Sequence, residues 1–420
     1  MSRNAIIKLL RWASGQQPVA RSQWRTATSL CLTLALAIPF GLCAQRSPFN
    51  GLDVLPTDST GHYRILIGGH FHGESTNRSG YPAATLLANL DTINKLGAHL
   101  FLSTGDLFMD PVKDRPRYER AFFSKLKMPF FNAPGNHDVG GGASQRTPDA
   151  YSIALSYFPA LSSEGLDHLR NGFSQLNGDV RDTAFQAAVR RLFDEAHAFD
   201  KDSLSLGLGA CVMFDLESSA GKLTSKHIQE LDFWANSLSD PEAAELIGNR
   251  LFIISHRPIW AEDDPQYSDL FKENTRSTFG TNFRKDVYPL LEKIAQHAHV
   301  YWISGSVGGM APSSIFFQEH APNITFIQCA IRDEPRDALL VADVYPDSVR
   351  WSALSLTGQT LLAPEAYNAA WWRERVGKEE GFNWRLLPYM VKTTVLHRAF
   401  WWGAGLMLLL VLLVRRLLRR

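Results

Sequence analysis

MPFFNAPGNHD, residues 128–138, is a short apolar run that ends in a cluster of small and polar residues. The same layout occurs three more times: YRILIGG runs into HFHG at 70–73, AHLFLST into GD at 105–106, and NRLFII into SHRP at 255–258. Short apolar runs bounded in this way are typical of buried strands. Because strand ends converge on one rim of an open α/β sheet, we expect the four polar clusters to share a pocket.

The chain alternates between strand-like and helical patterns from about Tyr63 onward. Apolar residues recur at helical spacing in residues 81–97 and again in 224–238, between the short apolar runs. This alternation predicts an α/β fold built of strand, loop and helix units. Residues 141–205 interrupt it with a Gly-rich start and polar helical segments, so we predict a helical insertion over the strand ends within a folded domain of residues 45–361.

The polar clusters hold side chains that can ligate a metal: His72, Asp106, Asn136 and His256. Taken singly, each has an ordinary structural interpretation, because GD and GNHD sequences often form turns or helix caps and a strand-end histidine is usually structural. Together they combine nitrogen and oxygen donors, which suits a borderline divalent cation such as manganese, iron or zinc.

The four clusters give the chain a family resemblance. Their order and strand context over residues 61–356 resemble those of calcineurin-like metallophosphoesterases, whose motifs read DxH, GD, GNHD, a histidine after a strand, and GHxH. This resemblance implies a two-sheet sandwich flanked by helices. It also implies a phosphoric ester hydrolase in which one or two divalent cations activate water to attack a phosphate ester.

The resemblance also implies a role for each matching residue. Asp106 corresponds to the carboxylate that bridges two cations. A negative charge is needed between them because two close cations repel each other. Asn136 and His256 correspond to ligands of one cation and His72 to a ligand of the other. His137 corresponds to the residue that protonates the leaving oxygen or holds the phosphate.

Three positions depart from the family pattern. His70 stands where the motif has aspartate, and residues 305–308 read GSVG, without either histidine of GHxH. His70 offers a nitrogen in place of the missing carboxylate, and Ser306 offers a weak oxygen. The insertion contains further donors that we consider as replacements: Asp194, Glu195 and His197.

Two functional hypotheses therefore stay open. In the first, the chain is an active phosphoesterase, and the intact GNHD motif and His256 favour this because a purely structural descendant has no need of His137. In the second, the chain is a catalytically degenerate binding or scaffold module, which the loss of the GHxH histidines favours. Loss of metal ligands is expected to weaken metal binding by at least the roughly 10- to 100-fold that outer-shell changes cause.

The N-terminal 44 residues resemble a targeting segment. They contain five basic and no acidic residues, and an apolar stretch at 26–44 ends in small residues. This layout predicts a secretory signal peptide or an uncleaved N-terminal membrane anchor, and both interpretations stay open.

The C-terminal end has the composition of a membrane helix. Residues 399–414 are apolar, with Trp401 and Trp402 near one end and four arginines in the tail 415–420 at the other. Aromatic residues favour the headgroup region and arginines the cytoplasmic side, so we predict a transmembrane helix, a cytoplasmic tail and a domain on the outer side. Residues 362–398 are predicted to form the juxtamembrane linker.

Charge limits the class of partner. Between the two basic ends the body has 34 basic and 42 acidic residues. An acidic body repels phosphate backbones, which excludes a nucleic-acid partner. The expected partners are the membrane and a phosphorylated small molecule or lipid of the cell envelope.

The remaining candidate residues have weaker signals. Arg257 is a candidate phosphate ligand because a guanidinium presents a forked pair of donors, although it can equally cap a loop. Cys211 and Cys329 lie in apolar runs and are predicted to be buried strand thiols, with one disulfide as the alternative in an oxidising compartment.

Overall fold

The structure is a computed structural model of the 420-residue chain. It describes residues 47–54, 62–73, 77, 79–138, 150–155, 209–214, 222–239, 248–262, 264–271, 281–306, 314–375, 384, 387–396 and 398–418. The stretches outside these ranges include the predicted N-terminal targeting segment, residues 307–308, and the predicted insertion apart from residues 150–155. The insertion residues outside the ranges include Asp194, Glu195 and His197.

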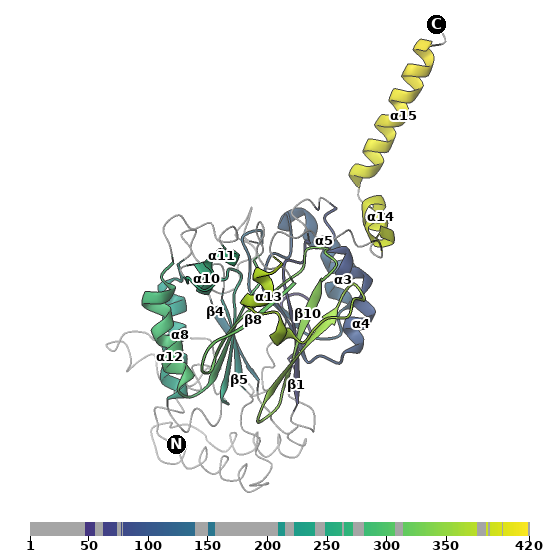
Figure 1. Cartoon of the computed structure of the whole chain (residues 1–420). Coiled ribbons are helices and arrows are strands. Elements are labelled where there is room, and N and C mark those ends of the chain that lie inside the picture. The colour runs from purple at the N-terminus through teal and green to yellow at the C-terminus, as the bar shows by residue number, and fades with distance from the viewer. Residues whose placement is uncertain are drawn as a thin grey trace, which may run out of the picture.

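Two mixed sheets form the centre of the domain (Figure 1). The first has the order β11-β10-β1-β2-β3, in which β1, β2 and β3 are parallel and β10 and β11 antiparallel. Its strands are β1 (Tyr63–Gly68), β2 (Leu100–Ser103), β3 (Phe130–Asn132), β10 (Ala338–Val344) and β11 (Val349–Ser355).

The second sheet has the order β4-β5-β6-β7-β9-β8, with a parallel centre and an antiparallel strand at each edge. Its strands are β4 (Ala150–Leu155), β5 (Gly209–Phe214), β6 (Arg250–Ile254), β7 (His299–Ser304), β8 (Ser314–Ala321) and β9 (Ile324–Ala330). The predicted two-sheet sandwich is confirmed.

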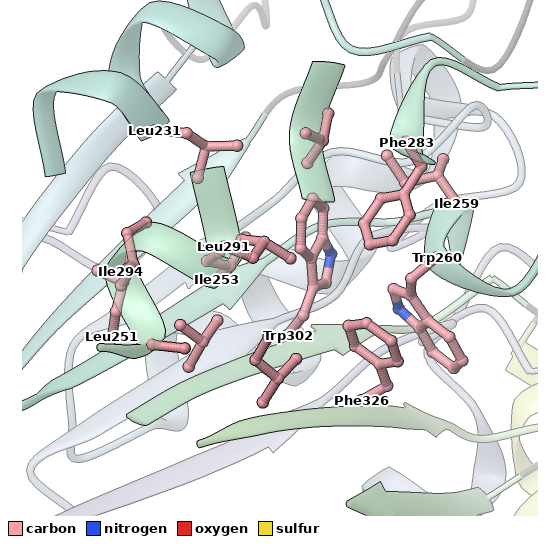
Figure 2. Close-up of a cluster of buried hydrophobic side chains, with 14 of the residues drawn as sticks. Leu231, Leu251, Ile253, Ile259, Trp260, Phe283, Leu291, Ile294, Trp302 and Phe326 are labelled. Carbon is pink, nitrogen blue, oxygen red and sulfur yellow. The ribbon is translucent and has the colours of Figure 1, made fainter. Parts of the chain in front are cut away.

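Three apolar layers hold the sandwich together. Side chains from both sheets, such as Ile65, Phe252 and Leu340, form the middle layer. Helices α3 (Ala84–Ala88), α4 (Leu90–Lys95) and α5 (Pro111–Ala121) cover the outer face of the first sheet. Helices α8 (Ser225–Leu238) and α12 (Tyr288–Ala295) cover the second sheet, where Leu231 and Trp302 belong to the cluster in Figure 2.

The predicted thiols lie inside this sandwich. Cys211 in β5 and Cys329 in β9 are buried and free. Burial raises the pKa of the Cys211 thiol and raises that of Cys329 to about 12, so both are expected to be unreactive.

Two predictions about local structure were incomplete. The predicted helical insertion is wrong for residues 150–155, which form β4, because their backbone pairs with the edge of β5. Strand β8 was not predicted. Its first half is buried and its second half is partly exposed, so its pattern is less regular than that of a central strand.

The segment that leads to the C-terminus packs on the domain instead of forming a simple linker. It contains the short turn η5 (Pro364–Ala366) and helix α13 (Ala369–Arg373), in which Trp372 is buried. Helix α14 (Leu387–Leu396) follows, and α15 (Arg398–Leu418) extends away from the domain (Figure 1). At 21 residues, α15 is long and apolar enough to cross a membrane.

An ion pair joins β1 to β10 at the start of the first sheet. Arg64 and Asp343 are register partners, and Arg64 Nε and Nη2 donate to the two Asp343 carboxylate oxygens at 2.6 and 3.1 Å. Burial alone would raise the pKa of Asp343, but hydrogen bonds from Arg64 and His62 hold it below its usual value.

We expect Asp343→Asn to lower the free energy of unfolding by about 1 kcal/mol at neutral pH, a small value because the pair lies near the surface. Because folding depresses this pKa, the contribution is present above the unfolded value of about 4 and is lost as the pH falls through the folded pKa. Denaturant unfolding of both proteins at several pH values measures the difference. A difference that does not shrink on acidification would contradict the assignment.

Candidate metal centre

The loops after β1 and β2 are hydrogen-bonded to each other and carry the first residues of the site. His70 and Asp106 follow β1 and β2 and adopt positive φ values of 59° and 55°. His70 N donates to Gly105 O at 2.7 Å, and Gly73 N donates to His70 O at 2.8 Å. A left-handed backbone conformation is unfavourable at a non-glycine residue, so the surrounding contacts must stabilise it. These backbone hydrogen bonds hold the two loops together, with the His70 and Asp106 side chains on the same side.

Three histidines surround one carboxylate oxygen. Asp106 Oδ2 lies 3.3 Å from His256 Nε2 and 3.8 Å from Nε2 of both His70 and His72. All four side chains are buried, and one ligand atom from each of His70, His72 and Asp106 lies within 4.8 Å of the others. In tetrahedral coordination at about 2.1 Å, neighbouring ligand atoms are about 3.4 Å apart, so this spacing fits a cation between them.

The protonation states also fit a cation. Burial and the neighbouring His72 hold the pKa of His70 well below its usual range. Burial would raise the pKa of Asp106, but His256, His72 and His70 hold it well below its usual range. His256 Nδ1 donates to Thr104 O at 2.9 Å, which leaves Nε2 as the ring nitrogen that faces Asp106. A neutral His70 beside an ionised Asp106 is the combination that binds metal.

Unsatisfied polar atoms point the same way. His70 Nδ1 and both ring nitrogens of His72 are buried without a hydrogen-bond partner among the described residues. Buried polar atoms are nearly always hydrogen-bonded, so each exception needs an explanation. Coordination of a divalent cation by His72 would explain its unpaired nitrogen. The residues present therefore fit the metal that the sequence predicts.

Asp138 fixes the loop behind the cluster. Its carboxylate accepts hydrogen bonds from Leu107 N at 2.8 Å, Gly135 N at 2.9 Å and Asn132 Nδ2 at 3.0 Å. Sequence reasoning saw this residue only as the last letter of GNHD and gave it no role. The hydrogen bonds identify it as a positioning residue, because it joins the loop after β2 to the loop after β3.

We expect Asp138→Asn to lower the free energy of unfolding by about 1 to 3 kcal/mol, since an amide NH2 would face donors in place of an acceptor. Metal affinity should fall as well, because the loop carrying Asp106 loses its anchor. Thermal unfolding and metal titration measure the two effects. Asp347→Asn, in an exposed turn, is the matched control, and equal behaviour of both variants would remove the assigned role.

The other predicted site residues surround the cluster at different depths. His137 is half-buried, its N donates to Asp106 Oδ1 at 3.0 Å, and its ring centroid lies 5.0 Å from that of His72. Asn136 is exposed. Arg257 follows His256 in the chain, and its carbonyl accepts hydrogen bonds from Ser255 and Ser304.

Two features near the missing GHxH motif are structural. Ser306 N donates to His256 O at 2.7 Å, which ties the end of β7 to the loop after β6. Gly305 lies so close to Thr104 that a Cβ added to Gly305 would be 1.8 Å from Thr104 Oγ1.

Asn77, which matches a glycosylation pattern, donates through Nδ2 to His72 O at 2.7 Å and so supports the histidine loop.

Comparison with known proteins places the chain in a family. The sequence profile of the calcineurin-like phosphoesterases matches residues 63–301, which is more than half of the chain. No curated protein sequence matches it.

Solved structures with some similarity to the chain are distant. GAP50, the anchor in the inner membrane complex of Plasmodium, is 12% identical with a TM-score of 0.40, covering 76% of this chain and 95% of that one. A dimetal phosphatase from Danio rerio is 15% identical with a TM-score of 0.38, covering 72% and 98%. A predicted phosphoesterase from Streptococcus pneumoniae is 10% identical with a TM-score of 0.28, covering 71% and 93%. On the sequence profile, together with the two-sheet sandwich and the buried histidine and aspartate cluster, the chain belongs to the calcineurin-like phosphoesterase family.

Proposed function

We propose that this chain is a membrane-anchored, metal-dependent phosphoesterase that hydrolyses a phosphate ester of an exported or envelope substrate. One observation carries the proposal: Nε2 atoms of three buried histidines converge on Asp106 Oδ2. A purely structural cluster would satisfy its buried nitrogens by hydrogen bonds, whereas neither His72 nitrogen has a hydrogen-bond partner within the part of the chain that the structure describes. Manganese, iron and zinc suit this donor set.

The residues around the cluster divide the chemistry between them. A bound divalent cation polarises a phosphoryl oxygen and activates water for attack. Asp106 supplies the negative charge that balances the cation. His137 is anchored through its backbone to Asp106 and lies half-buried beside His72, which suits donation of a proton to the leaving oxygen. Arg257 is proposed to bind phosphate oxygens as a forked donor.

The full-length chain, purified in detergent, allows a direct test. Elemental analysis should find about one manganese, iron or zinc ion per chain, because four donors surround one point. With that ion present, an aryl phosphate or phosphodiester should be hydrolysed, and His137→Ala should remove turnover while leaving the metal bound. Absence of any bound metal would refute the proposed activity.

A second candidate function has its own supporting observations. Asn136 is exposed, and Ser306 stands where the first histidine of GHxH is expected, so neither position supplies a buried nitrogen or oxygen ligand among the described residues. These features favour a catalytically degenerate binding or scaffold module. A chain that retains metal but turns over neither phosphomonoesters nor phosphodiesters would favour this candidate over the first.

The proposed location places the domain outside the membrane and the C-terminus in the cytoplasm. Arg415 and Arg416 lie in the last turn of α15, and Trp401 and Trp402 lie near its first turn. This asymmetry supports a cytoplasmic C-terminus, because basic residues favour that side. Protease treatment of intact cells or spheroplasts should digest the domain and spare a C-terminal tag.

A further inference from the structure

We infer that the metal cluster opens toward the membrane that α15 enters, and that its substrate is the phosphate head group of a lipid in that membrane. This inference rests on the proposed phosphoesterase function and narrows its substrate class. It depends on the side of the domain from which α15 leaves, on the contacts that fix this side, and on the apolar side chains exposed there.

Helix α14 connects the membrane helix to the site. Only residue 397 separates α14 from α15, and α14 packs against α3. The residue before α3, Ala83, donates its N–H to Phe71 O at 2.7 Å, and Phe71 lies between the two cluster histidines His70 and His72. Since α3 has five residues, it is about 7.5 Å long, so α14 is held close to the histidine loop.

Helix α13 fixes the preceding segment at the same end of the sandwich. Trp372 Nε1 donates to Ile315 O at 3.1 Å, and Arg336 lies 4.6 Å over the Trp372 ring. Ile315 pairs with Cys329 near the carboxyl end of β9, which is the rim where the parallel strands of its sheet end. The chain is therefore attached to the rim on both sides of residues 376–386.

Figure 1 shows the resulting direction. Helix α15 extends from the end of the domain that carries α3, α5, α10 (Ile259–Glu262) and α11 (Ser268–Phe271), two of which follow the SHRP cluster after β6. The β10–β11 turn, at Tyr345–Ser348, lies at the opposite end because β10 runs antiparallel to β1. A membrane around α15 would thus face the metal-binding rim and lie far from that turn.

Exposed apolar side chains at this end suit a bilayer surface. On α14, Leu387, Val391 and Leu396 are 42%, 52% and 55% exposed. Val112, at the start of α5 just beyond the GD loop, is 67% exposed beside the exposed Lys113. Exposed apolar side chains on a helix are typical of segments whose apolar face lies in the headgroup region of a membrane.

These features favour a lipid over a soluble phosphate ester. The lipid head group is already held within the plane that faces the cluster, so the site would meet it at high local concentration without capture from solution. In the reaction, water forms a bond to phosphorus and the bond from phosphorus to the lipid ester oxygen breaks. That oxygen takes a proton from His137, which releases a lipid alcohol and inorganic phosphate.

The orientation can be measured without relying on catalysis. Val112→Cys and Asp347→Cys place a cysteine for fluorescent labelling at each end of the first sheet. The two ends are well separated, because the six residues of β1 alone span about 20 Å. Both variants carry Cys31→Ser and Cys43→Ser, and the native Cys211 and Cys329 are buried. In the full chain reconstituted in phosphatidylcholine vesicles with a headgroup spin label, fluorescence at position 112 should be quenched and that at 347 should not. Equal quenching, or quenching at 347 alone, overturns the inference.

The substrate class is decided on the same vesicles. With phosphatidic acid in the bilayer, the wild-type chain should release phosphate at a rate that falls as the lipid is diluted with phosphatidylcholine at constant bulk concentration. Hydrolysis of a soluble aryl phosphate without hydrolysis of phosphatidic acid overturns the lipid assignment and leaves the phosphoesterase function standing. Hydrolysis of neither, with metal bound, removes the phosphoesterase function and the lipid assignment with it.

Discussion

Asp106→Asn is expected to reduce metal affinity and phosphoesterase activity by at least about 100-fold, the upper range seen when even an outer-shell partner of a ligand is lost. The carboxylate supplies a negative charge at the point where three histidine nitrogens meet. An amide keeps the shape of the side chain but cannot balance the charge of a cation. Burial makes the loss larger, because water cannot take over as a ligand without entering the site.

The substitution is designed to leave the fold unchanged. Asp106 has a φ of 55°, a conformation that asparagine also tolerates, and an asparagine Oδ1 can still accept from His137 N. Calorimetric titration with metal measures the loss of metal affinity, and thermal unfolding shows whether the fold has been destabilised. Asp347→Asn is the control for loss of a charge. If Asp106→Asn binds metal as tightly as the wild type, Asp106 is not a ligand.

Much of the rim could be predicted from the sequence, because the determining pattern is local. A buried strand followed by a polar cluster is visible in a few consecutive residues, and the parallel order of β1, β2 and β3 then brings Asp106 and His72 together. The same reasoning placed His256 at the same rim, on the assumption of a single sheet. The structure instead puts the preceding strand, β6, in the second sheet, and only the family resemblance implied a two-sheet sandwich, since no local pattern says how two sheets stack.

The residues that sequence reasoning missed act through distant contacts. Trp372 lies in the segment 362–398 that the sequence predicted to be a linker, yet its hydrogen-bond partner Ile315 is 57 residues away. Asp138 is part of a recognisable motif, but its role depends on hydrogen bonds from the loop after β2, about 30 residues earlier in the chain. Tertiary contacts of this kind leave no periodic signal.

Gly135→Ala is expected to disrupt the metal centre without changing any ligand. An added Cβ would be 2.2 Å from Asp106 Oδ1 and 2.6 Å from Asp106 N. Gly135 cannot retreat, because its own N–H is held by Asp138 at 2.9 Å. The Asp106 carboxylate must therefore move, and a displacement of about 1 Å at a reacting site costs roughly 100-fold in activity. Crowding should also lower the free energy of unfolding by about 1 to 3 kcal/mol.

Gly97→Ala provides the matched control, because it makes the same substitution away from the site. Gly97 has a φ of +62° and no heavy atom within 4 Å of an added Cβ, so its cost is backbone strain of about 1 to 2 kcal/mol without any crowding. Both variants should therefore lose stability, but only Gly135→Ala should lose metal affinity. Metal titrations of the two proteins, compared at equal folded fraction, distinguish these effects. Similar metal affinity in both would mean that the loop between β3 and Asp138 does not control the position of the Asp106 carboxylate.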